Sequence, residues 1–227
     1  MYEKFGQFID GNWSPSSNKE TYEVINPATE EVLGHASKAT PEDVDRALKS
    51  AEKGLAVWKK ITPWERSYIL RRIADKLREK KDVLAKWMTL ENGKPLAEGV
   101  GETNGAADIF EWNAEETKRI FGQTIESRFE DTRVHVYYQP VGVVAALSPW
   151  NFPLILAARK ISTALAAGCS VIIKPDTITP GVVMELVDIC RECGVPPGAV
   201  NLLSGDPPAI ASQLIQSDII KKISITG

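Results

Sequence analysis

Residues 142–154 read GVVAALSPWNFPL. The opening GVVAAL is a continuous apolar run, as in a strand that is buried on both faces of a sheet. Downstream, the strand patterns CSVIIK, AVNLLSG and KKISIT alternate with helical patterns over about 154–167, 180–193 and 207–217. Apolar strands that alternate with helices at this spacing predict an α/β fold with a parallel sheet covered on both faces.

Polar residues follow the strands of this predicted sheet. In open parallel sheets, ligands bind at the carboxyl ends of the strands. The residues that leave three strands at this edge are Ser148, Trp150, Asn151, Lys174, Ser204 and Gly205. The sequence contains neither GxGxxG nor the P-loop pattern GxxxxGK. The pattern therefore predicts a nucleotide-sized crevice of another kind, although Lys174 taken alone is equally consistent with a surface lysine.

The N-terminal part is mainly helical in pattern. The stretch FIDGNW contains the Asp-Gly of a tight hairpin, and Thr40-Pro41 predicts the start of an amphipathic helix that runs to Trp58. Two longer helical patterns cover residues 65–90 and 96–121. Apolar residues at helical spacing interrupt the basic run 71–86, which favours a solvated helix face over a phosphate-binding patch.

A short segment of different character joins these two parts. Residues 123–142 contain TRVHVYYQPVG, whose alternating β-branched and aromatic residues predict a strand, with Pro140 at its boundary. Two interpretations remain open from the pattern: an exposed arm used in assembly, or a hairpin packed on its own domain.

Composition excludes several classes of protein. The chain has 227 residues and a formal net charge of −3, so it lacks a basic footprint for nucleic acid or for a membrane surface. No apolar run is long enough to span a membrane, and the polar start lacks a signal-peptide core. The odd count of three cysteines fits a reducing compartment. We therefore expect a cytoplasmic protein.

The cysteines and histidines do not form a recognisable metal site. Cys190 and Cys193 form a CxxC at the end of a helical pattern rather than at its start, where the helix dipole would lower a thiol pKa. No second CxxC or histidine pair accompanies them, so we interpret both as packing residues and expect no metal. Cys169 begins a buried strand, and His135 alternates within a strand.

The sequence resembles the aldehyde dehydrogenase superfamily over essentially its whole length. The matching stretches are NPATEEV, WERSYILRRIADKL, LENGKP, QPVGVVAALSPWNFPL, ALAAGCSVIIKPD, PPGAVNLLSG and ISITG, in the family's order and at its spacing. The resemblance implies a Rossmann-like cofactor-binding domain that is incomplete here. Residues 1–122 and 143–227 would form that domain, and 123–142 would be an oligomerisation ribbon, as in homodimeric or homotetrameric enzymes.

The resemblance also implies roles for the polar residues of the crevice. Asn151 would donate its side-chain amide to the substrate oxygen as half of an oxyanion hole, a task that suits a neutral donor. Ser148 and Trp150 would contact the cofactor, and Lys174 would bind the adenosine ribose. Ser204 and Gly205 would line the adenine side.

Family members oxidise an aldehyde with a cysteine nucleophile, a glutamate base and hydride transfer to NAD or NADP. The nucleophile and the base both lie beyond the position that matches Gly227. We therefore expect the catalytic domain to be absent and the 227 residues alone to be inactive. The alternative function is that of a truncated, non-catalytic protein that binds nucleotide or assembles with partners.

Two further expectations concern specificity. Arg159 stands where members that act on succinate semialdehyde carry an arginine, although a solvent-exposed helix arginine is equally consistent with the pattern. NAD-preferring members commonly carry a glutamate where this chain has Thr177. A threonine hydroxyl can donate to a phosphate and brings no repelling charge. We therefore predict that NADP is accepted at least as well as NAD, with Asp176 turned away from the ribose. The alternative is that Asp176 swings in to replace the missing carboxylate and keeps NAD preferred.

Overall fold

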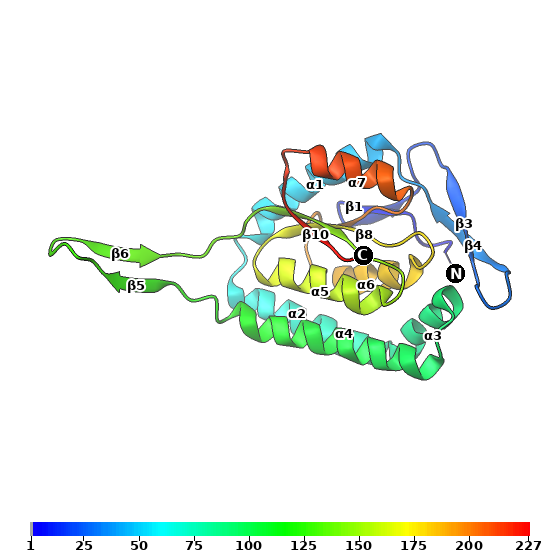
Figure 1. Ribbon diagram of the computed structural model, residues 1–227, viewed down its shortest axis with the longest axis horizontal. Coiled ribbons are helices and arrows are strands. Elements are labelled where there is room, and N and C mark those ends of the chain that lie inside the picture. Colours follow the sequence, from blue (N-terminus) through cyan, green and yellow to red (C-terminus); the bar gives the residue numbers. More distant parts are fainter. Residues whose placement is uncertain (1) are drawn as a thin grey trace.

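The computed structural model describes residues 2–227, and its centre is a six-stranded sheet (Figure 1). The strand order is β10-β7-β8-β9-β1-β2, and the first four of these strands are parallel. Their bounds are β7 Val143–Leu147, β8 Ser170–Lys174, β9 Val200–Leu202 and β10 Ile220–Ile225, with β1 Gln7–Ile9 and β2 Asn12–Ser14 antiparallel at one edge. The predicted α/β fold with an open parallel sheet is confirmed.

Helices cover both faces of this sheet (Figure 1). Alternate residues of β7 point to opposite sides: Val143 and Ala145 belong to the apolar cluster beneath α1 and α7, and Val144 and Ala146 belong to the larger cluster beneath α5 and α6. The helices are α1 Pro41–Trp58, α2 Pro63–Glu79, α3 Lys81–Asn92, α4 Leu96–Thr117, α5 Pro153–Ala166, α6 Gly181–Glu192 and α7 Pro207–Gln216. On the α5 face, α2 and α4 add a further layer.

The predicted hairpin and the start of the first helix are both present. Asp10 and Gly11 join β1 to β2 with φ of 55° and 80°, the left-handed values that a tight hairpin turn needs. Thr40 caps α1, because its hydroxyl accepts from the backbone N–H of Asp43 at 3.3 Å while the Asp43 carboxylate accepts from the backbone N–H of Thr40 at 3.0 Å.

The single helix predicted over 65–90 is wrong. The structure divides it into α2 and α3 at Lys80, whose ψ of 11° lies outside the helical range. The bend lets Leu77 and Leu84, one on each side of it, both be fully buried. A second strand pair, β3 Thr21–Ile25 and β4 Val32–Ser37, was not predicted, and α4 ends before residue 121.

The basic run on α2 forms a solvated helix face, as predicted. Arg71 pairs with Glu111 and Glu115 of α4, and Arg78 pairs with Asp108 and Glu111. These ion pairs join α2 to α4 at the protein surface. The cysteine interpretation also agrees with the structure, since Cys169, Cys190 and Cys193 are free and buried.

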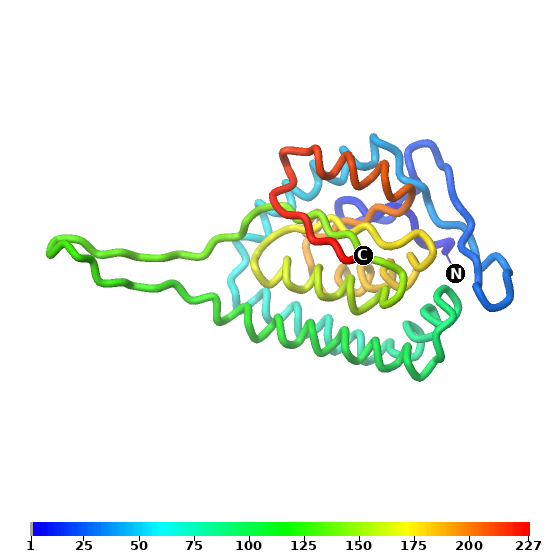
Figure 2. The backbone as a smooth tube through the Cα atoms, in the orientation of Figure 1, coloured from blue at the N-terminus to red at the C-terminus, as the bar shows by residue number. Residues whose placement is uncertain are grey.

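The segment between the two helical regions projects from the body as a two-stranded ribbon (Figures 1 and 2). Strands β5 Gln123–Glu126 and β6 Arg133–Val136 pair with each other antiparallel, and nearly all of their residues are exposed. The structure therefore favours the exposed arm over a hairpin packed on its own domain. Its use in assembly remains a prediction.

Candidate functional site

The carboxyl edge of the parallel sheet contains a hollow of about 380 Å³. It opens where β7 and β8 end, and the two strands stay paired up to this point because the backbone N–H of Ser148 donates to the carbonyl of Lys174 at 3.2 Å. The start of α7 and the end of β10 form the other walls. The lining residues are Leu147, Ser148, Pro149, Lys174, Asp176, Pro207, Pro208, Ala211, Ile225, Thr226 and Gly227.

Two polar side chains in this hollow lack protein partners. The hydroxyl of Ser148 is buried without a hydrogen bond, and the side chain of Lys174, in a residue only 4% exposed, makes no hydrogen bond or ion pair within residues 2–227. Burial lowers the pKa of Lys174, while Asp176 and Asp206 oppose that effect. Leaving a buried polar group unpaired costs about 1–3 kcal/mol, so the Ser148 hydroxyl suits a ligand that carries an acceptor oxygen. The Lys174 ammonium lines the same hollow and can donate to such a ligand as well.

The positions of Thr177 and Asp176 relative to the hollow differ from those expected from the sequence. Asp176 lines the hollow beside Lys174, whereas Thr177 is not among the lining residues. The Asp176 carboxylate also accepts from the backbone N–H of Ile178 at 3.2 Å, which holds the loop in a short turn. The expectation that Asp176 faces away is therefore not supported by this loop.

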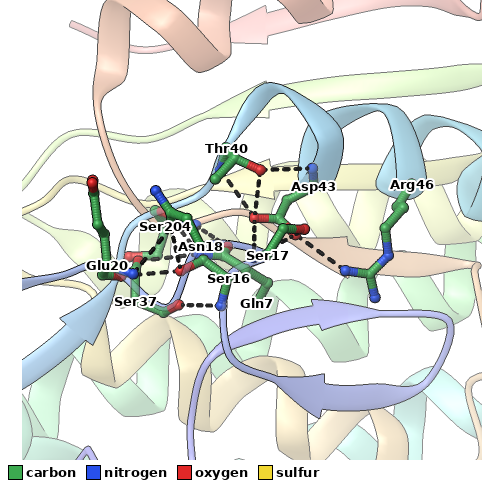
Figure 3. A network of polar contacts seen from close by, with 10 residues as sticks. All are labelled: Gln7, Ser16, Ser17, Asn18, Glu20, Ser37, Thr40, Asp43, Arg46 and Ser204. Carbon is green, nitrogen blue, oxygen red and sulfur yellow. Dashed lines mark hydrogen bonds and ion pairs between the residues drawn. The ribbon is translucent and has the colours of Figure 1, made fainter.

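Ser204 belongs to a buried polar network rather than to the lining of the hollow (Figure 3). The Gln7 side chain accepts from the backbone N–H of Ser204 at 2.8 Å and donates to its carbonyl at 3.0 Å. The Ser204 hydroxyl bonds to the Tyr22 hydroxyl at 2.6 Å. Gly205 follows with φ of 141°, and a Cβ there would lie 2.8 Å from the backbone nitrogen of Ala39. Both residues thus shape the turn before α7, and direct cofactor contact remains a prediction.

Asn151 and Trp150 lie in the exposed turn between β7 and α5. The Asn151 side-chain oxygen accepts from the backbone N–H of Phe152 at 3.1 Å, and its NH₂ group makes no hydrogen bond to any described residue. That amide is therefore free to donate to a ligand. The turn itself is held from below, because Asn92 donates to the Trp150 carbonyl at 2.9 Å and Lys94 donates to the Asn151 carbonyl at 3.1 Å.

Arg159 is exposed on α5 and lines a different hollow, of about 410 Å³, between α5 and β10. Its neighbour Lys160, also in this lining, is mostly buried and donates to the Thr226 hydroxyl at 2.6 Å, and burial lowers the Lys160 pKa. The structure thus separates Arg159 from the hollow that contains Ser148 and Lys174. Sequence reasoning assigned no role to Lys160, and its position beside Arg159 was the only available signal.

The sequence profile described as "Aldehyde dehydrogenase family" matches residues 13–227. The chain belongs to the aldehyde dehydrogenase family. Among its relatives, the chain is 42% identical over 220 residues to a glutarate-semialdehyde dehydrogenase of Pseudomonas putida. It is 41% identical over 219 residues to a succinate-semialdehyde dehydrogenase of Escherichia coli whose name specifies NADP(+).

These alignments cover 97% and 96% of this chain but only 46% and 45% of the two relatives. The aldehyde dehydrogenase chain described here therefore spans about half the length of the curated relatives it matches. Its fold agrees with the crystal structure of a succinate-semialdehyde dehydrogenase from Burkholderia pseudomallei. The TM-score is 0.97 and the identity 40%, over 98% of this chain and 46% of that one.

Two features are absent from the described part of the chain. No helix among residues 2–227 has the length and apolar character needed to cross a membrane. The same residues contain no group of three or more His, Cys, Asp or Glu side chains arranged to hold a metal ion.

Proposed function

We propose that this chain is the cofactor-binding part of an NAD(P)-dependent dehydrogenase that oxidises a short semialdehyde to a carboxylic acid. The observation that carries the proposal is the buried, unpartnered hydroxyl of Ser148 together with the unpartnered ammonium of Lys174, in the hollow next to the turn that presents Asn151. The E. coli relative is named for succinate semialdehyde and NADP(+), and the P. putida relative for glutarate semialdehyde.

The residues around the hollow fit a nicotinamide dinucleotide, which when bound supplies the hydride acceptor. Lys174 would donate to ribose or phosphate oxygens, and Ser148 would donate its free hydroxyl. Trp150 lies half exposed beside them. Ser204 and Gly205 would act through the backbone turn that they form on the adenine side. Thr177 brings no carboxylate to the position where NAD-preferring members commonly carry a glutamate, and the Asp176 carboxylate beside Lys174 is engaged with the backbone N–H of Ile178. We therefore propose that NADP is accepted at least as well as NAD.

Asn151 would hold the oxygen of the reacting aldehyde. Its NH₂ group has no partner in the described structure, and it needs no change of protonation to stabilise developing negative charge. Each such donor contributes about 10²–10³ in kcat in enzymes that use one. Arg159 would pair with a distal carboxylate of a semialdehyde, as a guanidinium does with two parallel hydrogen bonds.

The exposed ribbon supports assembly of identical subunits. An isolated two-stranded hairpin is only marginally stable in water, so packing against a partner would add the missing contacts. Its exposed apolar side chains are suited to that packing: Ile125, Phe129, Val134, Tyr137 and Tyr138. We propose that the complete enzyme is a homodimer or homotetramer whose subunits exchange this ribbon.

The proposal is tested by nucleotide binding to the 227-residue chain. Isothermal titration with NADP and with NAD should detect binding that Lys174→Met weakens at least about ten-fold, because the substitution removes the ammonium that lines the hollow. Lys59→Met changes an exposed lysine at the end of α1 and serves as the matched control. Equal binding by wild type and Lys174→Met would overturn the assignment of this hollow.

The same chain should not reduce either nicotinamide with an aldehyde. Its three cysteines form no disulfide, but all are buried, so none can attack a substrate as a nucleophile. Turnover would be followed by absorbance of the reduced cofactor. A chain that binds nucleotide without turnover agrees with a cofactor-binding part. One that binds none and only self-associates would instead support the alternative function, an assembly protein.

A further inference from the structure

A buried ion pair lies directly beneath the turn that carries Asn151. Lys94 follows the end of α3 and Glu102 lies on α4, and their side chains are only 7% and 1% exposed. The Lys94 ammonium donates to the Glu102 carboxylate. Neither residue lines the hollow at the sheet edge, and the proposed function uses neither of them.

Both members of the pair bind the backbone around Asn151. Lys94 donates to the Asn151 carbonyl at 3.1 Å and lies 4.5 Å from the ring centre of Phe152. One oxygen of Glu102 accepts from the backbone N–H groups of Leu154 and Ile155 at 2.9 and 3.1 Å. The pair therefore holds the chain at Asn151 itself and again at the start of α5.

The turn has few other restraints. The residue that caps α5, Phe152, offers no side-chain hydrogen bond to the free N–H groups of the helix, so Glu102 supplies the acceptor that the helix start needs. The side chains of Trp150, Asn151 and Phe152 are exposed and make few packing contacts. One other contact reaches the turn from below, from Asn92 to the Trp150 carbonyl at 2.9 Å.

A buried ion pair is costly to desolvate and is weak evidence for stability. Here both charged side chains also form hydrogen bonds with backbone groups of one short segment, residues 151–155. Such contacts are expected of side chains that fix the position of that segment. We infer that Lys94 and Glu102 are positioning residues that set the place of the Asn151 amide. The inference rests on the proposed function for the role of Asn151, but the geometry that it describes can be measured without turnover.

The first test is hydrogen exchange on the 227-residue chain. In Lys94→Met and in the double variant Lys94→Met/Glu102→Leu, the amides of Leu154 and Ile155 should exchange at least about ten-fold faster than in wild type, while the amides of β8 keep their protection. The double variant removes both charges and the acceptor together and leaves no unpaired buried charge, so it decides the matter alone if Lys94→Met fails to fold. Lys76→Met breaks a surface ion pair with Glu79 and is the control. Unchanged exchange in the folded variants overturns the inference.

The second test separates positioning from general support. In the complete enzyme, Lys94→Met should lower kcat about ten-fold to 100-fold with little change in KM for the cofactor, since a displacement near 1 Å is enough for such a loss. In an Asn151→Ala background the same change should lower kcat no further. An equal loss in both backgrounds overturns the inference. Failure of the proposed function would appear differently, as absent turnover in wild type with the exchange effect intact.

Discussion

Glu91 gives the chain a stability that depends on pH. Its carboxylate is buried on α3 and accepts from the backbone N–H groups of Gly181 at 2.7 Å and Val182 at 3.2 Å, and from the hydroxyl of Tyr2. Burial raises its pKa from 4.5 to about 7, although these hydrogen bonds act in the opposite direction. The protonated form is therefore favoured in the folded chain relative to the unfolded chain.

The sign and the size follow from linkage. Between pH 4.5 and 7 the folded chain binds more protons at Glu91 than the unfolded chain, so the free energy of unfolding falls as pH rises and levels off above 7. The raised pKa corresponds to a loss on the order of 3 kcal/mol across this window. Glu91→Gln cannot titrate and should lose this contribution to the pH dependence.

The assay is urea unfolding followed by circular dichroism at half-unit steps from pH 5 to pH 8. The stability of Glu91→Gln minus that of wild type should rise with pH by about 2–3 kcal/mol, because contributions of all other groups cancel in the difference. Glu52→Gln, at an exposed position of α1, is the control and should give a flat difference. A flat difference for Glu91→Gln as well would refute the reasoning.

Three other predictions concern packing and specificity. Gly181→Ala would place a Cβ 2.2 Å from the Trp87 ring and should lower the free energy of unfolding by about 1–3 kcal/mol in urea, whereas Gly101→Ala, with open space, should not lower it. In the complete enzyme, Arg159→Ala should raise KM for succinate semialdehyde at least about ten-fold more than for an uncharged aldehyde of similar length. An equal rise in KM for both aldehydes would show that Arg159 does not bind the substrate carboxylate. Thr177→Glu should reduce the ratio of kcat/KM for NADP to that for NAD about ten-fold. An unchanged ratio means that Thr177 does not set the preference.

The features that were predicted correctly depend on local pattern. The apolar run before Ser148 and its repetition before Lys174 identify buried parallel strands, whose carboxyl ends must share an edge. The hairpin at Asp10-Gly11 and the cap at Thr40 were equally readable, because turn and cap chemistry involves residues only a few positions apart.

The features that were missed depend on contacts between distant segments. Lys94 reaches Asn151 across 57 positions, and Gln7 reaches Ser204 across 197, so no local pattern could reveal either bond. No Gly or Pro marks the end of α2 at Lys80 in the sequence. The helix ends there because Leu77 and Leu84 pack into the same core. The direction of the Asp176 side chain depends on its hydrogen bond with the backbone N–H of Ile178, and the spacing of residues in the sequence does not predict that bond.

The ribbon has a consequence for how the molecule is organised. Its two ends leave and rejoin the same end of the body, after α4 and before β7, and its strands pair with each other (Figure 2). A short loop in place of residues 123–138 would therefore interrupt none of the strand pairs or helices of the body. The arm is in this sense a removable module. Excising it would leave every strand pair of the six-stranded sheet in place, so the arm could change length or sequence without altering the elements that form the crevice.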